Sequence, residues 1–107
     1  MKVYRYDITE VDGDHENESS ILTNFELDYK QKDAICRWER GLDTSTKYEE
    51  EYDGMWTDEG TIIKSPEMAM CDEMNKEELN KLIEFSGLVY FDKEQYDKDI
   101  KEVYESA

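Results

Sequence analysis

A helix signal in the last third of the chain constrains the fold more than any other feature of the sequence. Asn75 can cap a helix, and Glu78 follows three residues later, which is the spacing of a capping box. Met74 and Leu79 occupy the positions of a hydrophobic staple around that cap. Gly87 then stands where a helix would stop. These residues predict a helix that begins after Asn75 and ends before Gly87.

The same signals recur a few residues later, where Asp92 and Gln95 repeat the capping-box spacing. Apolar residues return every three or four positions in both segments, as in a helix with one buried face. The residues expected on these faces are Leu79, Leu82, Ile83 and Phe85 in the first helix and Tyr96, Ile100, Val103 and Tyr104 in the second. The segment between them, 88–91, is expected to be a linker or a short strand.

Strand patterns occupy most of the first 64 residues. Residues 1–11 and 21–30 alternate apolar and polar side chains, the period of two of a half-buried strand, and 12–20 is expected to be a long charged turn. Residues 44–64 predict a second hairpin around an Asp-Glu-Gly tip. The expected fold class is therefore α+β, with an antiparallel sheet of about four strands (two hairpins) packed against two to four helices, the last two at the C-terminus.

Two further helical segments are predicted outside the C-terminal third. Residues 31–40 have a helical period, with Trp38 expected in the core and Gly41 as the stop. Arg37 and Arg40 on this helix are expected to pair with nearby acids. Ser65 and Pro66 are expected to open a short helix, because serine caps well and proline suits the first turn. No Gly/Ser-rich or Pro-rich linker divides the 107 residues, so one acidic domain spanning 1–107 is expected.

The charge of the chain is strongly unbalanced. Thirteen Lys and Arg stand against 29 Asp and Glu, a net charge of −16. Residues 7–18 and 43–60 each carry a net charge of −6 and so hold twelve of the sixteen excess charges. Charge spread evenly would only favour solubility and repel nucleic acids and anionic membranes. Clustered charge predicts rows of carboxylates that fit a groove built for phosphates.

The predicted partner-binding residues come from these two acidic runs. Carboxylates interleaved with aromatic rings suit a protein interface, because the rings supply contact area and the charges steer association. The first run supplies Asp12, Asp14, Glu16 and Glu18, and the second supplies Asp43, Tyr48, Glu49, Glu50, Glu51, Tyr52, Asp53, Trp56, Asp58 and Glu59. For Tyr48 and Trp56, a place in the core is weighed equally against a place in the interface.

The sequence contains none of the common catalytic or cofactor motifs, namely GxGxxG, GxxxxGK[ST], GxSxG and HExxH. No enzyme activity and no cofactor are therefore expected. No metal site is expected either, because an EF-hand loop counted from Asp12 would place Asn17 at its glycine position and Thr23 at its glutamate position. Cys36 and Cys71 are expected to be buried, reduced thiols. The lack of a signal peptide and of a membrane span predicts a cytoplasmic protein.

Two functions from different classes follow from these patterns. The first is an acidic inhibitor that occupies the basic nucleic-acid-binding surface of a target protein, such as a host nuclease complex, without binding nucleic acid itself. In this the chain is similar in type to small phage and mobile-element proteins, including anti-CRISPR and anti-restriction proteins, although no motif identifies such a family. The alternative is a protein that binds or sequesters a small anionic, nucleotide-like ligand. The residues for that ligand would be Lys30, Lys32, Arg37 and Arg40. An enzyme that uses a carboxylate pair or the Cys36 thiolate ranks last.

Overall fold

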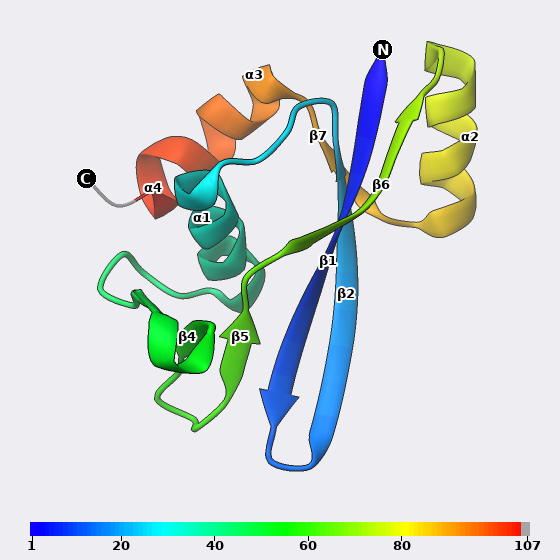
Figure 1. Ribbon diagram of the computed structural model, residues 1–107. Helices are drawn as coiled ribbons and strands as arrows, with labels where there is room; N and C mark the ends of the chain where they lie inside the picture. The colour runs from blue at the N-terminus through cyan, green and yellow to red at the C-terminus, as the bar shows by residue number, and fades with distance from the viewer. Residues whose placement is uncertain (106–107) are drawn as a thin grey trace.

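A long antiparallel hairpin forms the centre of the protein, whose computed structural model describes residues 1–105. Strand β2 (His15–Thr23) pairs along its whole length with β1 (Lys2–Asp12), from Tyr4 to Asp12 (Figure 1). Asp12 pairs with His15, so the turn consists of only Gly13 and Asp14, and Gly13 has a φ of 61°. The expectation of a long charged turn over 12–20 is wrong, because backbone pairing with β1 extends through these polar residues.

The chain leaves the sheet earlier than its alternating pattern indicates. β2 ends at Thr23, whose hydroxyl donates to the Phe25 carbonyl at 2.6 Å. Asp28 then caps helix α1 (Tyr29–Arg40) by exchanging two 2.9 Å hydrogen bonds with Gln31. The predicted strand over 21–30 is therefore wrong in its second half, because this capping box commits the backbone to a helix. The helix ends at Gly41 (φ 65°) as predicted.

The second edge of β1 is occupied by two strands in succession. β5 (Ile62–Lys64) pairs with the end of β1, and β6 (Glu67–Glu73) pairs with its first half. Pro66 lies between them and has no N–H to donate, so the ladder is interrupted there. The short helix expected after Ser65 is wrong, because β1 offers an open edge that the following residues fill.

The sheet is mixed rather than purely antiparallel. β3 (Tyr48–Glu49), the single 3₁₀ turn η1 (Glu50–Tyr52) and β4 (Gly54–Trp56) precede β5, and β4 and β5 form the predicted second hairpin. β7 (Val89–Phe91) pairs parallel to β2, so the segment between the last helices is a short strand. The seven described strands run β3-β4-β5-β1-β2-β7, with β6 also beside β1. The α+β class is confirmed, and the simple four-stranded antiparallel sheet is wrong.

Both predicted C-terminal caps form, although among the described residues only the cap at Asn75 is a complete capping box. Helix α2 (Lys76–Ser86) begins at Asn75, whose side chain accepts from the Glu78 N–H at 2.8 Å, and it ends at Gly87. Asp92 accepts from the Gln95 N–H at 2.6 Å and starts a continuous helical stretch. This stretch comprises α3 (Lys93–Tyr96), the π-helical η2 (Asp97–Lys101) and α4 (Glu102–Tyr104).

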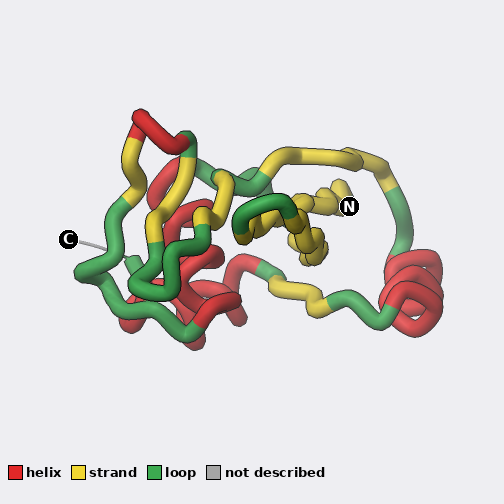
Figure 2. The backbone as a smooth tube through the Cα atoms, turned by 90° about the horizontal axis from the view of Figure 1, so that it is seen from below, coloured by secondary structure: helices red, strands yellow, loops and turns green. Residues whose placement is uncertain are grey.

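The sheet is buried on both faces near the start of β1. On one face, Tyr6, Ile35 and Tyr96 belong to the main core beneath α1 and the C-terminal helices. On the other face, Val3 and Leu22 pack with Leu79 of α2 in a smaller cluster. Figure 2 shows α2 on one side of the hairpin and the remaining helices on the other. Alternate residues of β1 and β2 therefore serve two different cores.

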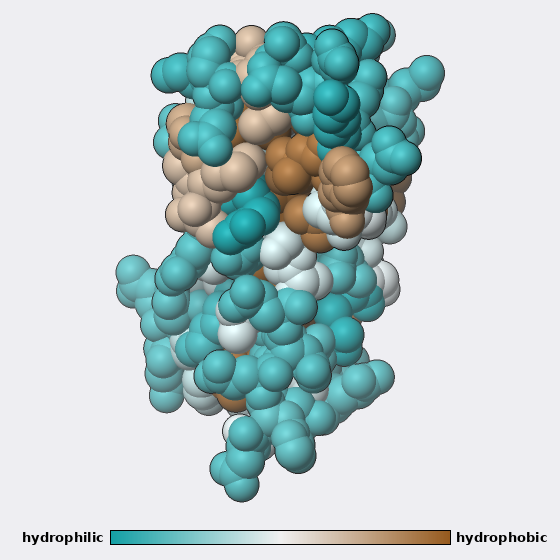
Figure 3. Space-filling view, turned by 90° about the vertical axis from the view of Figure 1, so that its right-hand side faces the viewer, coloured by the Kyte–Doolittle hydropathy of each residue, from teal (hydrophilic) through white to brown (hydrophobic). Residues whose placement is uncertain are grey.

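Two of the residues predicted for the buried helix faces are exposed. Phe85 is 88% exposed and Val103 is 61% exposed. α2 packs only on the small cluster around Leu79, which is too narrow to cover the whole predicted stripe. Figure 3 shows apolar atoms gathered in the upper half of this side of the molecule, where α2 lies, above a hydrophilic lower half.

A pair of substitutions on α2 tests this difference. Leu79→Ala is expected to lower the free energy of unfolding by roughly 2–3 kcal/mol, because it truncates the one fully buried side chain of α2, which packs with Val3 and Leu22. Phe85→Ala is expected to change it by less than about 0.5 kcal/mol. Urea unfolding followed by circular dichroism measures both. Equal losses for the two variants would contradict the packing described above.

Candidate functional site

The strand register brings the tips of the two hairpins to the same end of the sheet. Val11 of β1 pairs with Ile62 of β5, so the turn after β1 and the loop before β5 lie side by side. Both are at the lower end of the molecule in Figure 1. We call this region the acidic end. Its six exposed carboxylates belong to Asp12, Asp14, Glu16, Glu18, Asp58 and Glu59.

The loop that carries Asp58 and Glu59 is held by its two buried threonines. The Thr57 and Thr61 hydroxyls lie 2.6 Å apart, and the Thr57 N–H donates to the Thr61 carbonyl at 2.9 Å. Gly60 has a φ of 81° and donates back to the Thr57 carbonyl at 3.0 Å. This closed loop leaves the two carboxylates at its exposed apex.

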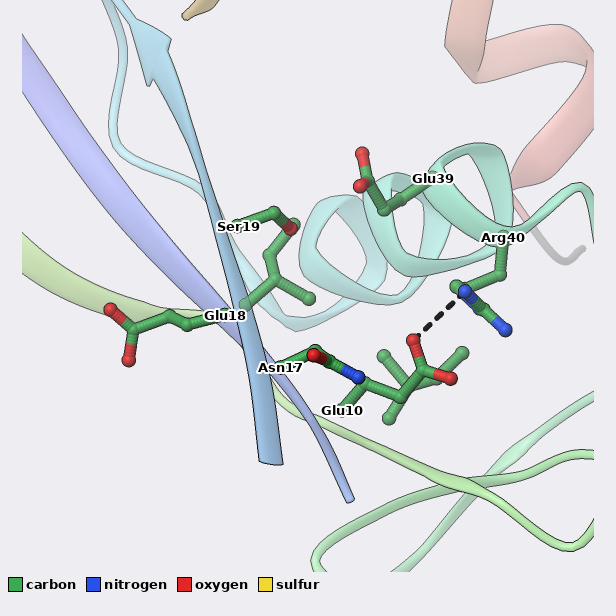
Figure 4. A pocket seen from close by; sticks show the side chains of 8 residues that line it. Glu10, Asn17, Glu18, Ser19, Glu39 and Arg40 are labelled. Carbon is green, nitrogen blue, oxygen red and sulfur yellow. Dashed lines mark ion pairs between the residues drawn. The ribbon is translucent and has the colours of Figure 1, made fainter. Parts of the chain in front are cut away.

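Two acids of the first run, Asp7 and Glu10, form ion pairs, and the other four do not form them with any described residue. Arg40 of α1 forms a 2.8 Å ion pair with Glu10, and Arg5 forms one of 3.2 Å with Asp7 (the first pair is drawn in Figure 4). In the same view Glu18 points away from Arg40, on the other side of β2. Within residues 1–105, none of the eleven acids predicted for the partner site forms an ion pair with Lys or Arg. Their charge is therefore available to a partner.

The second run presents its aromatic rings outward. Trp56 is 48% exposed and Tyr48 is 37% exposed, so of the two alternatives weighed for them the core is wrong. The Tyr52 and Trp56 rings lie 5.2 Å apart, centre to centre. The Tyr48 hydroxyl donates to Asp53 at 2.6 Å, and this hydrogen bond raises the pKa of Tyr48. Met55, between these residues, is the buried side chain of β4.

The other acids of the second run lie beside the acidic end rather than at it. Gly54 pairs with Lys64 and Trp56 pairs with Ile62, so η1 lies toward the far end of the β4–β5 hairpin. The exposed acids on and around η1 are Glu49, Glu50, Glu51 and Asp53. Asp43 is more distant in the chain, in the loop after α1, where two hydrogen bonds from Ser45 lower its pKa. Apart from Asp43, the predicted residues thus form one joint end and one adjoining turn.

The basic residues weighed for a small anionic ligand do not converge. Arg37 is buried and donates to the Thr46 and Tyr104 carbonyls at 2.9 and 2.7 Å, so the expectation that it pairs with acids is wrong. Arg40 does pair with an acid, as expected. The Lys32 ammonium lies 5.9 Å from the centre of the Tyr6 ring, and Lys30 is exposed.

Sequence reasoning missed a hollow beside the Tyr48 turn. Its lining comprises Tyr29, Lys32 and Asp33 of α1 with Tyr48 and Ser65, and its volume is about 360 Å³. The alternating pattern of 21–30 predicts Tyr29 in a strand, whereas the structure places it in the first turn of α1. The Asp28–Gln31 spacing was the signal that could have corrected this.

The two cysteines have different environments. Cys36 is buried as predicted, whereas Cys71 on β6 is exposed, so the prediction for Cys71 is wrong. Cys71 belongs to the outer strand beside β1, which the sequence reading had not placed in the sheet. Among residues 1–105, no group of three or more His, Cys, Asp and Glu is arranged to hold a metal ion. No helix in the same range is long and apolar enough to cross a membrane.

Comparisons with protein-family models, curated proteins and solved structures find no match to this chain. Any assignment of function must therefore come from the geometry of the surface described above.

Proposed function

We propose that this protein is an inhibitor that binds the basic, nucleic-acid-binding surface of another protein. The observation that carries the proposal is a set of eleven acids, drawn from two separate runs of the chain, without a cationic partner among the described residues. Six of them share one end of the sheet. Bringing together so many unpaired carboxylates opposes folding through their mutual repulsion, and a cationic partner would relieve that repulsion.

The spacing of these carboxylates supports a partner that binds phosphates. Averaged over the whole accessible surface of 6782 Å², one net charge occupies about 420 Å², far more area than a phosphate occupies on duplex DNA. Along one face of β2, Glu16 and Glu18 are separated by only ~6.6 Å, about twice the axial rise per phosphate of one DNA strand. The acidic end therefore approaches the charge spacing of a nucleic acid that the average surface lacks.

The exposed rings beside the acidic end supply apolar contact area to the proposed interface. Association driven by exposed charges weakens with salt, because each charge is screened over about 10 Å at 0.1 M. Tyr48 and Trp56 add apolar area that salt does not screen, and aromatic rings are common anchors of protein interfaces. In the proposed complex, the carboxylates steer the partner and the rings hold it.

A capture experiment with matched variants tests the proposal. The intact protein is immobilised, exposed to a bacterial lysate and washed at low and high salt, and bound proteins are identified by mass spectrometry. We expect a nucleic-acid-binding protein that is released by salt and by competing DNA. Glutamine and asparagine at Glu49, Glu50, Glu51 and Asp53 should weaken its binding by at least about tenfold.

The control removes the same number of charges elsewhere. Neutralising Glu67, Asp72, Glu84 and Glu102, which are exposed and lie outside both runs, should change the affinity by less than about threefold. If both sets weakened binding equally, net charge alone would account for it. A captured partner that DNA fails to displace would also contradict the proposal.

A further inference from the structure

The hollow between α1 and β3 is the concave feature next to the predicted partner-binding turn. It has a volume of about 360 Å³ and is lined by Tyr29, Lys32, Asp33, Tyr48 and Ser65. Tyr29 is 73% exposed and Tyr48 is 37% exposed, so both rings are open to a ligand. The hollow is thus a recess with two aromatic walls and one carboxylate.

The carboxylate of Asp33 is unpaired among the residues that the structure describes. It is half-buried, yet within residues 1–105 it accepts no hydrogen bond and forms no ion pair. Arg37 is one helical turn away, but its guanidinium hydrogen bonds go to two backbone carbonyls. Burial raises the pKa of Asp33, and the charge of Arg37 only partly opposes this. A cation in the hollow would compensate for the water that Asp33 has lost.

The charges around the hollow favour a cation over an anion. The Tyr48 hydroxyl donates a 2.6 Å hydrogen bond to Asp53, which raises the pKa of Tyr48. The negative charges of Glu50 and Asp33 are close enough to raise this pKa as well. Lys32 is the one basic residue of the lining, and its ammonium lies over the Tyr6 ring. Three carboxylates against one ammonium would repel a phosphate.

We propose that this hollow binds a cationic side chain, a guanidinium or ammonium group, between the rings of Tyr29 and Tyr48 and against the Asp33 carboxylate. Aromatic faces attract such cations, and a carboxylate adds a charge-assisted hydrogen bond. The inference rests on the proposed function in that an arginine or lysine of the basic partner would be the occupant. It thereby assigns Tyr29 and Asp33 to an interface that the acidic runs alone do not include.

A titration of the isolated protein tests the hollow without the partner. Arginine amide is added to the full-length, isotope-labelled chain, and nuclear magnetic resonance follows the backbone amides. We expect saturable shifts at residues 29–33 and 48. Asp33→Asn should weaken this binding by about fivefold, and so should Tyr29→Ala, while Tyr29→Phe should preserve it. Glu84→Gln removes one exposed charge on α2, outside both acidic runs, and should leave the affinity unchanged.

Two outcomes would overturn the inference. One is arginine amide shifting all exposed acids alike, without saturation and without dependence on Asp33. The other is inorganic phosphate or adenosine monophosphate binding at residues 29–33 where arginine amide does not, which would favour an anion site at Lys32. The amide spectrum of each variant shows whether it is folded. Because no partner is present, failure of this titration is distinct from failure of the capture experiment.

Discussion

Replacing Arg37 by methionine is expected to lower the free energy of unfolding at pH 7 by about 3 kcal/mol. Arg37 is 2% exposed and donates to the Thr46 and Tyr104 carbonyls, which belong to the loop after α1 and to the last turn of α4. Methionine fills the space but cannot donate to either of these part-buried carbonyls. Arg37→Lys should recover less than half of the loss, since one ammonium cannot reproduce the two-sided geometry of a guanidinium.

Arg40→Met is the matched control on the same helix. Its ion pair with Glu10 is partly exposed, and such pairs contribute at most about 1 kcal/mol. Urea unfolding monitored by tryptophan fluorescence gives the free energies of all three variants. If Arg37→Met were no more destabilising than Arg40→Met, the buried guanidinium would not connect the segments as described.

The second large effect is a loss of stability at alkaline pH that originates at Cys36. Burial raises the pKa of the Cys36 thiol from 9.0 to about 12, and the neighbouring Asp33 adds to the shift. The unfolded chain therefore releases this proton from about pH 9, whereas the folded chain keeps it until about pH 12. The stabilisation is fully present below pH 9 and is lost as the pH rises. Its slope is about 1.4 kcal/mol per pH unit.

Variants at the two cysteines isolate the contribution of Cys36 to the loss of stability at alkaline pH. Cys36→Ala should abolish the decline between pH 9 and 10, whereas Cys71→Ala at the exposed thiol should leave it unchanged. Above pH 10 a further decline is expected in all three proteins, since burial also raises the pKa of Tyr6 and Tyr96. Urea midpoints measured under reducing conditions from pH 8 to 11 test both statements. A Cys36→Ala variant that declined as steeply as the parent would refute the assignment.

The proposed interface combines elements that are separate in the sequence. The acidic end presents charge, and the turn around η1 presents Tyr48 and Trp56. The hollow between α1 and β3 is the proposed binding site for one cationic side chain. The turn around η1 and the loop that carries Asp58 and Glu59 both adjoin the hairpin formed by β4 and β5. Gly54 is essential there, because a Cβ at this position would approach the Ile63 carbonyl oxygen to 2.2 Å.

Local signals predicted most of the helices, although the Ser65-Pro66 signal is followed by a strand. The capping box at Asn75, the cap at Asp92 and the stops at Gly41 and Gly87 are all formed, because each depends on residues within one turn of the chain. The β4–β5 hairpin was predicted for the same reason. The error at 21–30 arose where two local signals competed, since the alternating pattern ran on into the capping box of Asp28.

The features that could not be predicted depend on neighbours distant in the chain. β6 is a strand because β1 offers an open edge, and Phe85 is exposed because α2 packs on a small cluster. Neither the edge nor the width of that cluster is visible in the residues themselves.

The sequence by itself determined the caps at Asn75 and Asp92, the helix ends at Gly41 and Gly87, the second hairpin, the α+β class and the excess of negative charge in two runs. Those properties depend on residue chemistry and short-range spacing. Only the tertiary structure decided that Val11 pairs with Ile62, that Arg37 binds carbonyls and Arg40 binds Glu10, and that a hollow opens beside Tyr48. Strand register and side-chain pairing are set by the packing of the whole chain, and they place the two acidic runs next to each other.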